Sequence, residues 1–392
     1  MTPTVAIAGG SLGGLTAALL LRDLGCDVSV HERATDTLQA RGAGIAVLPH
    51  TLRYPVERLG IAADAISTST EWIRFVRRNG SVDRALEHRY RFSAWNTIYR
   101  ALLDAFDPRR YHLGAEVTAF EQGGDHVTVG FADGGESACD LLVCADGITS
   151  AARARLLPDV APRYSGYVAW RATVPEAKLG RETYDALHDA LTYQVLEHSH
   201  VLVYPIPGPD GEVEPGQRLI NMVWYRNVPE PELAGFLTDR DGQRRPVSLP
   251  PGSVPDERVA AMREDVRELL APQIADVALS ADEPFVQAVF DIDVPRMAFG
   301  RTCLVGDAAF AVRPHAAAGT AKAAEDGWVL ADRLAAAGGD VPAALASWES
   351  AQLALGADLL RRNREIGELS QFTGGFRAGD PRLIFGLYGP GR

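Results

Sequence analysis

The sequence lacks the features that mark membrane, secreted and nucleic-acid-binding proteins. Its 392 residues contain no apolar stretch that approaches the length of a membrane span, and residues 1–4 lead into an apolar segment without a charged region or a cleavage site. The formal net charge of −12 is spread over the chain without a basic block. We therefore expect a cytoplasmic protein that binds neither nucleic acid nor membranes.

Cysteine is also scarce. The four cysteines, Cys26, Cys139, Cys144 and Cys303, lie in or beside apolar runs and show no C-x-x-C spacing. This pattern predicts buried, reduced thiols rather than disulfides or a metal site. There is no internal repeat and no low-complexity block, and the length predicts two intertwined domains with a sizeable core.

What the sequence does contain begins with a glycine-rich turn near its start. The apolar run Val5–Ala8 precedes residues 9–14 (GGSLGG), and an apolar helical pattern follows over residues 15–25. Glycines let the backbone approach a pyrophosphate, whose charge is met by the N–H groups and the positive dipole end of the helix. Ser11 replaces the second glycine of the usual G-x-G-x-x-G, and it is small enough for the same approach.

A carboxylate completes this first motif. The next predicted strand, residues 27–32, ends at Glu32, about 20 residues past the glycines, where a carboxylate accepts hydrogen bonds from ribose hydroxyls. A bare 2′-hydroxyl is implied, as in the ADP half of FAD or NAD, because a 2′-phosphate would be repelled. The alternative is a tight turn that binds nothing, and the strand, the helix and Glu32 together weigh against it.

Two further motifs lie far along the chain. An apolar strand over residues 140–144 delivers Asp146 and Gly147 to a loop, and Arg153 follows in a helical start. Residues 301–309 (RTCLVGDAA) place Gly306 and Asp307 after another apolar run, and the pattern continues to a proline at 314 and a glycine at 319.

In this order and at these separations, the three motifs resemble the single-component FAD-dependent aromatic hydroxylases, which share the p-hydroxybenzoate hydroxylase fold. The resemblance runs from about residue 4 to about residue 350. Within that family, the chain resembles the 2,6-dihydroxypyridine 3-monooxygenase-like enzymes in particular. The stretches that carry this finer similarity are residues 9–11 (GGS), 164–171 (YSGYVAWR), 204–208 (YPIPG) and 313–319 (RPHAAAG).

The resemblance implies an α/β fold in which a Rossmann-like FAD-binding domain is interleaved with a substrate domain built on a mixed or antiparallel sheet. The expected FAD domain comprises residues 1–70, 91–160 and 285–350. The expected substrate domain comprises residues 71–90 and 161–284, with strands at 164–174, 191–196, 200–206 and 218–227. A C-terminal helix and tail would occupy residues 351–392.

The end of the chain, residues 370–392, is aromatic but shows no helical periodicity. It can pack on its own domain, cover a substrate entrance or contact a neighbouring subunit. A homo-oligomer is possible on these grounds, and the oligomeric state stays open.

For the cofactor, the resemblance implies that Asp307 binds the ribityl hydroxyls and that the loop 314–320 follows the pyrimidine edge of the flavin, where helix N–H groups stabilise negative charge. It places Asp146 and Gly147 near the diphosphate and lets Arg153 dock the phosphates of the reductant. Trp95 stands where many relatives have a phosphate-binding arginine, and Asn96 or nearby backbone is the expected substitute. The residues expected to contact FAD are Gly9, Ser11, Leu12, Gly13, Gly14, Glu32, Arg33, Gly44, Val47, Val117, Asp146, Gly147, Gly306, Asp307, Pro314, Ala317, Ala318, Gly319 and Thr320.

Aromatic and polar side chains alternate in the strands of the expected substrate domain, which suits a flat heteroaromatic ring. A half-buried sheet is the alternative explanation for each of them. His315 is the first catalytic candidate, because a histidine beside the flavin can hold or remove a ring hydroxyl proton. Tyr204 and Tyr225 are the other catalytic candidates, and a purely structural histidine is the alternative for His315. The expected substrate-binding residues are Tyr193, His198, His200, Trp224 and Pro314.

The chemistry implied by the resemblance starts with reduction of FAD by NADH or NADPH. O2 then adds at flavin C4a, and the hydroperoxide transfers one oxygen atom to an activated ring carbon. Only one dinucleotide fold is visible, so the nicotinamide is expected to bind transiently at the surface, and no metal is needed. A hydroxypyridine is the predicted substrate, and a phenol or polyketide-type ring of secondary metabolism is the alternative.

Four rival functions use the same scaffold or part of it. A flavin halogenase would carry a W-x-W-x-I-P signature, which the chain lacks. A classical NAD dehydrogenase would use only the first motif and leave Asp146 and Asp307 without a role. A flavin-dependent alkene reductase is separated by product analysis under O2, and an FAD-binding sensor by the absence of ligand-stimulated NAD(P)H oxidation.

Overall fold

The computed structural model describes residues 3–38 and 43–392, and three β-sheets organise them. The first sheet is parallel apart from its β17 edge and has the order β17-β18-β10-β1-β2-β6. Its strands are β17 (Ala298–Phe299), β18 (Thr302–Leu304), β10 (Leu141–Cys144), β1 (Thr4–Ala8), β2 (Asp27–Glu32) and β6 (Tyr111–Leu113).

The second sheet has nine strands in the order β15-β16-β11-β14-β13-β12-β4-β5-β3. A separate antiparallel sheet of three strands contains a hairpin whose turn includes residues 123–124, where the sequence predicts one from its Gly-Gly pair. The strands of these two sheets are β3 (Gly44–Ala46), β4 (Thr68–Val76), β5 (Val82–Ala94), β7 (Val117–Gln122), β8 (Val127–Phe131), β9 (Glu136–Cys139), β11 (Arg163–Pro175), β12 (Ala190–Leu196), β13 (Ser199–Ile206), β14 (Leu219–Asn227), β15 (Ser248–Leu249) and β16 (Phe285–Asp291).

The helices connect and cover the sheets. Gly25, with φ of 89°, ends the first helix with a backbone conformation that glycine adopts without strain. The α-helices are α1 (Leu12–Asp23), α2 (Pro49–Glu57), α3 (Ala63–Ile66), α4 (Trp95–Asp104), α5 (Ala151–Leu156), α6 (Arg181–Leu187), α7 (Glu230–Phe236), α8 (Asp256–Leu269), α9 (Pro272–Ser280), α10 (Gly319–Ala336) and α11 (Val341–Gln371).

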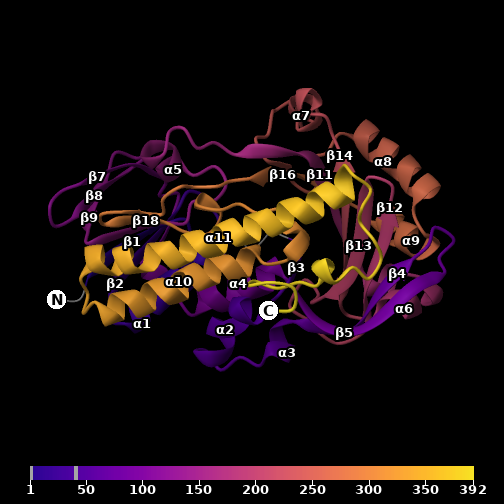
Figure 1. The fold of residues 1–392 in the computed structure, drawn as a ribbon, viewed down its shortest axis with the longest axis horizontal. Coiled ribbons are helices and arrows are strands. Elements are labelled where there is room, and N and C mark those ends of the chain that lie inside the picture. Colours follow the sequence, from indigo (N-terminus) through magenta and orange to yellow (C-terminus); the bar gives the residue numbers. More distant parts are fainter. Residues whose placement is uncertain (1–2, 39–42) are drawn as a thin grey trace.

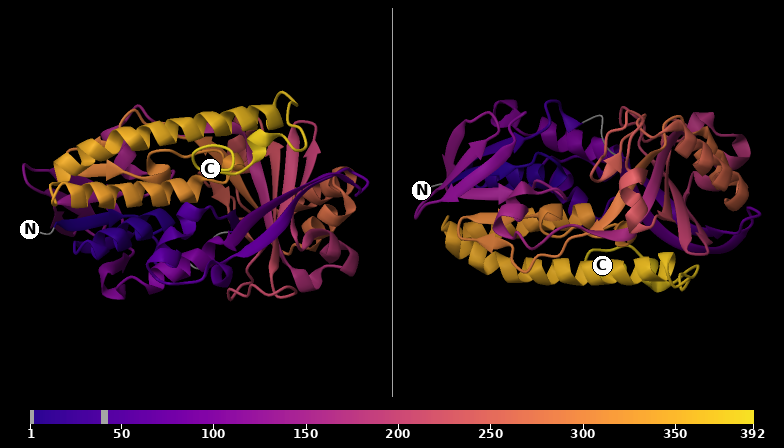
Figure 2. Two further views of the ribbon diagram at one scale, coloured as in Figure 1. Left: turned by 60° about the horizontal axis from the view of Figure 1, so that its bottom comes forward. Right: turned by 90° about the horizontal axis from the view of Figure 1, so that it is seen from above.

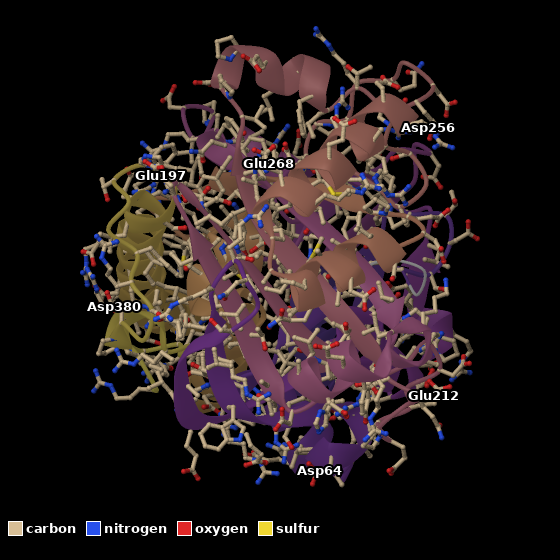
Figure 3. All side chains as sticks on the ribbon, turned by 90° about the vertical axis from the view of Figure 1, so that its right-hand side faces the viewer. Asp64, Glu197, Glu212, Asp256, Glu268 and Asp380 are labelled. Atoms are coloured by element: carbon tan, nitrogen blue, oxygen red, sulfur yellow. The ribbon has the colours of Figure 1, made fainter. Side chains whose placement is uncertain are left out.

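The two large sheets occupy opposite ends of the molecule, and α10 and α11 run side by side along the end that holds the six-stranded sheet (Figure 1). The long helix α11 reaches from the six-stranded sheet to the nine-stranded one, as the turned views also show (Figure 2). Helices α8 and α9 cover the outer face of the nine-stranded sheet (Figure 3). Its inner face is therefore directed toward the six-stranded sheet and the C-terminal segment.

Three apolar clusters form the core. The first surrounds the six-stranded sheet, the second lies between the nine-stranded sheet and α8 and α9, and the third lies on the inner face of that sheet. The four cysteines are buried and free, as predicted. Among the described residues, no helix has both the length and the apolar composition needed to cross a membrane, and no cluster of His, Cys, Asp or Glu side chains could hold a metal ion.

The strands predicted over residues 164–174, 191–196, 200–206 and 218–227 are confirmed, with bounds that differ by one residue at most. The C-terminal helix expected from residue 351 begins earlier, at Val341. The helix expected over residues 15–25 also begins earlier, at Leu12, because the last two motif glycines are themselves helical.

The sequence also predicts strands over residues 71–78 and 88–93, which are confirmed as the β4–β5 hairpin. It predicts a glycine-punctuated loop that runs from residue 41 into a helix; of this loop, Arg41 and Gly42 lie outside the described residues.

Candidate functional site

The glycine turn between β1 and α1 presses against the strand that carries the second motif. Gly9 has φ of 103°, and a Cβ atom there would lie 2.4 Å from the backbone oxygen of Ala145. Ser11 has φ of −79° and ψ of −172°, an extended conformation that any residue adopts, so serine can replace the usual glycine. Its hydroxyl does not cap α1, and the N–H groups of the first helical turn stay available to a ligand.

Glu32 holds this turn from the end of β2. Its Oε2 accepts a hydrogen bond from the backbone N–H of Gly10, and its Oε1 accepts one from Ala34, each at 2.9 Å. Each carboxylate oxygen keeps a further acceptor site, so the buried carboxylate can still bind the hydroxyl groups of a ribose.

A buried arginine joins the second motif to the third. Arg153 is 3% exposed, and its guanidinium donates to the backbone oxygens of Ala308 at 3.0 Å and Ile148 at 2.6 Å. Burial lowers the pKa of this guanidinium, and the carboxylates of Asp146 and Asp307 oppose the shift. Instead of reaching the surface, where it would meet the phosphates of a reductant, Arg153 fixes the loop of Asp146 against the loop of Asp307.

Asp307 projects into a cavity from a short 3-10 turn. Its side chain is open to the cavity but surrounded by protein on the other sides, so burial raises the pKa of its carboxyl group while Lys322 acts to lower it. Behind the turn, the carboxylate of Asp326 accepts from Gly306 N at 2.8 Å and from Lys322 Nζ at 2.7 Å. This fully buried ion pair anchors the turn to α10.

The loop after Pro314 leads directly into α10. Ala317 has a left-handed φ of 53°, and α10 begins at Gly319 with no side-chain cap at Ala318. The N–H groups at the start of this 18-residue helix therefore lack a partner within it and line the cavity. A helix start of this kind stabilises negative charge on a ligand.

These segments enclose two adjoining chambers that share Ser11, Gly147 and Arg171 in their walls. We call the one that contains Glu32, about 370 Å³, the nucleotide chamber, and the one that contains Asp307, about 430 Å³, the ring chamber. The predicted cofactor residues in the wall of the nucleotide chamber are Gly9, Ser11, Glu32, Arg33, Val117, Asp146 and Gly147. Those in the wall of the ring chamber are Ser11, Leu12, Gly13, Gly14, Gly44, Gly147, Gly306, Asp307, Pro314, Ala317, Ala318, Gly319 and Thr320.

The donors and acceptors of this double chamber fit FAD. Two helix starts without side-chain caps, those of α1 and α10, supply N–H groups for a diphosphate and for a negatively charged ring edge. The carboxylates of Glu32 and Asp307 supply acceptors for sugar hydroxyls, and the buried Oδ1 of Asp146 has no partner among the described residues. A ligand with an adenosine, a diphosphate, a sugar alcohol and a flat ring matches this order of groups.

Trp95 occupies the position where many relatives have a phosphate-binding arginine, and a different arginine lies at the chambers. Trp95 begins α4, lines both chambers and stacks on Tyr99 at 4.9 Å, while Asn96 lines neither chamber. Arg171 lines both chambers, and its guanidinium donates to the backbone oxygen of Gly44 at 2.5 Å and to Oε1 of Gln287 at 2.9 Å. Among the described residues it forms no ion pair with a carboxylate, so its charge is free to meet an anionic ligand.

On the side of the ring chamber that lies away from the three motifs, aromatic and histidine side chains form the wall. His200 lies between Tyr225 and Phe376, with ring centroids 4.7 Å away on each side, and His315 lies 5.0 Å from Tyr225. Tyr193 belongs to the same wall. Burial lowers the pKa of His200 to about 3 and that of His315 well below 6.5, and the latter pKa is lowered further by His200 and Arg313. Both histidines are therefore neutral near pH 7.

His315 is fixed through one ring nitrogen. Its Nε2 lies 2.7 Å from the hydroxyl of Tyr167, and its buried Nδ1 has no partner among the described residues. Burial raises the pKa of Tyr167 well above its usual value, while Arg313 opposes this shift. The hydroxyl therefore keeps its proton, and His315 Nε2 is its one hydrogen-bond partner among the described residues, so Nε2 accepts the hydrogen bond. Neutral His315 then carries its own proton on Nδ1.

Tyr204 closes the edge of the ring chamber near β3. Its hydroxyl donates to the backbone oxygen of Gly44 at 3.0 Å, and its ring stacks on Phe92 at 4.1 Å. Burial raises the pKa of Tyr204 to about 12, against the opposing effect of Arg171. Tyr204 and Arg171 thus hold the same backbone oxygen from two strands.

Three of the predicted residues lie outside both chambers. Trp224 is on the opposite face of β14 from Tyr225, where its Nε1 donates to Ser199 Oγ at 3.0 Å, because successive side chains of a strand point to opposite faces. His198, with φ of 54°, lines a separate surface hollow at the β12–β13 turn. Val47 is buried in the first core. These three positions therefore stay outside the site.

Several residues that line or support the ring chamber were not singled out from the sequence. Tyr167 and Arg171 both lie in the stretch 164–171. Because they are four residues apart in a strand, both side chains are on the inner face of β11, and this spacing could have identified them from the sequence. Gln287, which binds Arg171, comes from a strand that no motif marks. Phe376 and Phe385 come from the C-terminal segment, where only the aromatic content gave a signal.

Comparisons with known proteins agree with this geometry. The FAD binding domain family matches residues 2–226 and 243–363, and an FAD binding domain-like family matches residues 164–291. The chain is 37% identical to 2,6-dihydroxypyridine 3-monooxygenase of Paenarthrobacter nicotinovorans, over 99% of this chain and 97% of that protein. It is 30% identical to a salicylate hydroxylase of Pseudomonas putida, over 97% of this chain and 88% of that protein.

Solved structures give the same result. The structure of 2,6-dihydroxypyridine-3-hydroxylase from Arthrobacter nicotinovorans matches with a TM-score of 0.92 at 35% identity, over 99% of this chain and 97% of that one. HpxO of Klebsiella pneumoniae, complexed with FAD and uric acid, matches with a TM-score of 0.76 at 24% identity, over 97% of this chain and 90% of that one, which shows the fold alone. The predicted fold class is confirmed.

Proposed function

This chain belongs to the FAD binding domain family and is a flavoprotein monooxygenase, and we propose that it hydroxylates a hydroxypyridine with NAD(P)H as reductant and O2 as oxidant. The observation that carries the proposal is the ring chamber. Aromatic side chains and neutral histidines line it beside Asp307 and the start of α10, the groups that fit a flavin. The 37% identity to a 2,6-dihydroxypyridine 3-monooxygenase over nearly the whole of both chains supports the same choice.

The charges of the ring chamber favour a hydroxypyridine over a carboxylated phenol. Among its described residues, Arg171 is the one with a permanent positive charge, and two of its nitrogens already bind Gly44 and Gln287. His200 and His315 line the side of the chamber that lies away from the three motifs. Both are neutral, because burial lowers the pKa of each. A substrate carboxylate in this part of the chamber would lose its hydration without gaining a cation, which is costly. A hydroxypyridine without a carboxylate avoids this cost.

Bound FAD supplies the redox chemistry: it accepts electrons from the nicotinamide and activates O2 for transfer of one oxygen atom to the ring. In this proposal the chain holds the cofactor through Glu32 and Asp307, which accept hydrogen bonds from its sugar hydroxyls. The starts of α1 and α10 face its negative charges. The apolar wall of the ring chamber excludes water, which favours oxygen transfer over loss of the oxidant as H2O2.

His315 acts as a hydrogen-bond donor to the substrate in this proposal. Among the described residues its buried Nδ1 has no partner, and its ring lines the chamber, so an oxygen of the bound substrate is the proposed acceptor for the Nδ1–H. A donor at this atom stabilises the ionised form of a ring hydroxyl, and an ionised oxygen raises the electron density at the ortho and para carbons. Because the pKa of His315 lies well below 6.5, it serves as a fixed donor, and Tyr225 and Tyr204 are the remaining candidates for moving a proton.

The direct test uses the purified holoenzyme with either NADH or NADPH. Hydroxypyridines without a carboxylate should stimulate nicotinamide oxidation and yield a product heavier by one oxygen atom, in near-stoichiometric coupling. Salicylate serves as the matched carboxylated control and should give little product. A preference for salicylate, or oxidation that no ring compound stimulates, would contradict the proposal.

A second test addresses His315. In His315→Ala, product formed per nicotinamide oxidised should fall by about tenfold, the effect of losing a hydrogen bond to a charged group. The FAD content should stay unchanged. His198→Ala is the matched control, since His198 lies outside both chambers. Unchanged coupling at every pH tested would remove His315 from the proposed mechanism.

A further inference from the structure

The C-terminal segment, residues 372–392, returns to the ring chamber after α11 ends. Phe376, Leu383 and Phe385 line that chamber together with the inner strands, and each of the three is less than a tenth exposed. Figure 2 shows this last part of the chain, in yellow, folding back beside the nine-stranded sheet. The segment thus contributes a wall to the chamber that the three motifs form from the other side.

Phe376 makes the most direct contact of this wall. Its ring stacks on His200 with an interplanar angle of 17° and a centroid distance of 4.7 Å. His200 is held in turn by Ser370, whose Oγ lies 2.5 Å from its Nδ1. The last turn of α11 therefore positions His200, and the residues after it place Phe376 against a face of that buried ring.

Phe376 also lines a second space. A surface hollow of about 480 Å³ lies between the β12–β13 turn and residues 373–377, and Phe376 belongs to the walls of both the hollow and the ring chamber. Figure 3 shows Glu197, which lines the hollow, beside the C-terminal segment. The Phe376 ring is thus a partition between the two spaces.

The segment is anchored further along at the flavin-facing loop. The backbone N–H of Phe385 donates to Tyr90 Oη at 2.9 Å, and the two rings lie 4.6 Å apart. Gly386 N donates to the backbone oxygen of Ala316 at 3.2 Å, the residue that follows His315. The wall is thereby connected to the loop that carries the proposed hydrogen-bond donor.

We propose that the C-terminal segment determines substrate size, with Phe376 as the specificity-determining residue that limits the ring chamber to a single aromatic ring. The inference rests on the proposed hydroxylation of a flat ring. A substrate bound beside His200 and His315 meets the Phe376 ring as the boundary of its site. Shortening Phe376 joins the chamber to the hollow beyond it, in the direction where a second fused ring would extend.

The experiment compares the holoenzyme with Phe376→Ala, using a monocyclic hydroxypyridine and a bicyclic hydroxyquinoline as probes. Binding is measured by the change in flavin absorbance on titration, which does not depend on turnover, and product formation is measured in parallel. Tyr388→Ala is the matched control, because it removes a ring from the same segment at a position that is 52% exposed and outside the chamber. Phe376→Leu and the melting temperature of each variant guard against loss of folding.

In Phe376→Ala we expect the hydroxypyridine to bind about tenfold more weakly, as the loss of an aromatic contact predicts, and the hydroxyquinoline to bind more tightly. The ratio of the two affinities should shift in the same direction, but less, in Phe376→Leu, and stay at the wild-type value in Tyr388→Ala. An unchanged ratio in a folded, flavin-loaded Phe376→Ala would overturn the assignment while leaving the proposed function intact. A wild-type enzyme that responds to neither probe would instead overturn the proposed function.

Discussion

The nucleotide chamber and the ring chamber are built in different ways, although they adjoin. The nucleotide chamber is formed by turns and by single carboxylates at the ends of parallel strands, such as Glu32 and Asp146. Away from the motifs, the ring chamber consists of side chains from β11, β12, β13 and β14, the loop around His315 and the C-terminal segment. The first kind of site accepts little variation at its glycines, whereas the second can change its ligand by changing side chains.

The same contrast exists inside the ring chamber, between the turns of the motifs and the aromatic wall. In the proposed function, the cofactor is the same in every turnover and is held by groups whose positions are set by the turns of the fold, such as the N–H groups at the starts of α1 and α10. The proposed substrate is selected by the shape and charge of the wall that Tyr225, His200 and Phe376 present. Variants of the turns and of the wall should therefore have separable effects.

The largest separable effect should come from Asp307→Ala. Loss of this carboxylate removes a charged acceptor for the sugar hydroxyls, so FAD should bind about 100-fold more weakly, equivalent to about 3 kcal/mol. The purified variant should be colourless, and fluorescence titration with FAD measures the affinity. Asp358→Ala, an exposed carboxylate on α11, is the control. Full FAD content in Asp307→Ala would remove this residue from the cofactor site.

The next comparison uses neighbouring residues on opposite faces of β14. Trp224→Phe should lower the free energy of unfolding by about 2 kcal/mol, because it leaves buried space and deprives Ser199 of a hydrogen bond, and it should leave substrate affinity unchanged. Tyr225→Phe should weaken substrate binding with little change in stability. Denaturant unfolding and flavin absorbance titration distinguish the two outcomes. If Trp224→Phe weakened substrate binding and Tyr225→Phe lowered the stability instead, the substrate would lie on the Trp224 face of the sheet and the proposed site would be wrong.

A smaller effect, on the stability of the protein at acidic pH, should come from His200 in the ring chamber. Burial lowers the pKa of His200 to about 3 in the folded protein, against about 6.5 in the unfolded chain. Below pH 6.5 the unfolded chain therefore takes up a proton that the folded protein does not, and stability falls as the pH falls from 6.5 toward 3. His200→Phe should reduce this loss by about 1 kcal/mol between pH 6.5 and 5.5, measured by denaturant unfolding at each pH. Identical pH dependence in the variant and the wild type would refute the buried neutral state.

The smallest effect should come from Tyr167→Phe. This change removes the hydroxyl that fixes the Nε2 of His315, so the ring is free to take the other tautomer. Substrate affinity should fall by about threefold, with unchanged FAD content and melting temperature. Flavin absorbance titration over a range of pH measures it. If Tyr167→Phe bound the substrate as tightly as the wild type does, Nδ1 of His315 would keep its proton without Tyr167.

The same contrast explains how much could be predicted from the sequence. Gly9 and Glu32 were identified because a tight strand-to-helix turn and the end of the next strand restrict the residue type, and Asp307 was identified because its motif resembles that of a known family. Trp224 and Tyr225 could not be assigned to faces, because both faces of β14 are buried and aromatic residues occur on each.

The C-terminal segment could not be placed in advance for a different reason. Phe376 and Phe385 lie in irregular backbone, where no hydrophobic period relates sequence to orientation. Their position depends on where α11 ends and on a long-range hydrogen bond such as that from Phe385 to Tyr90. Contacts of this kind follow from the completed fold, so they leave no local pattern in the chain.

A crystal structure of the protein with FAD and a hydroxypyridine bound would locate both ligands. We expect the adenosine to lie beside Glu32, the pyrimidine edge of the flavin to meet the start of α10, and the substrate ring to contact His315 and Phe376. A substrate ring on the Trp224 face of the nine-stranded sheet, or a cofactor bound away from Glu32 and Asp307, would contradict this expectation.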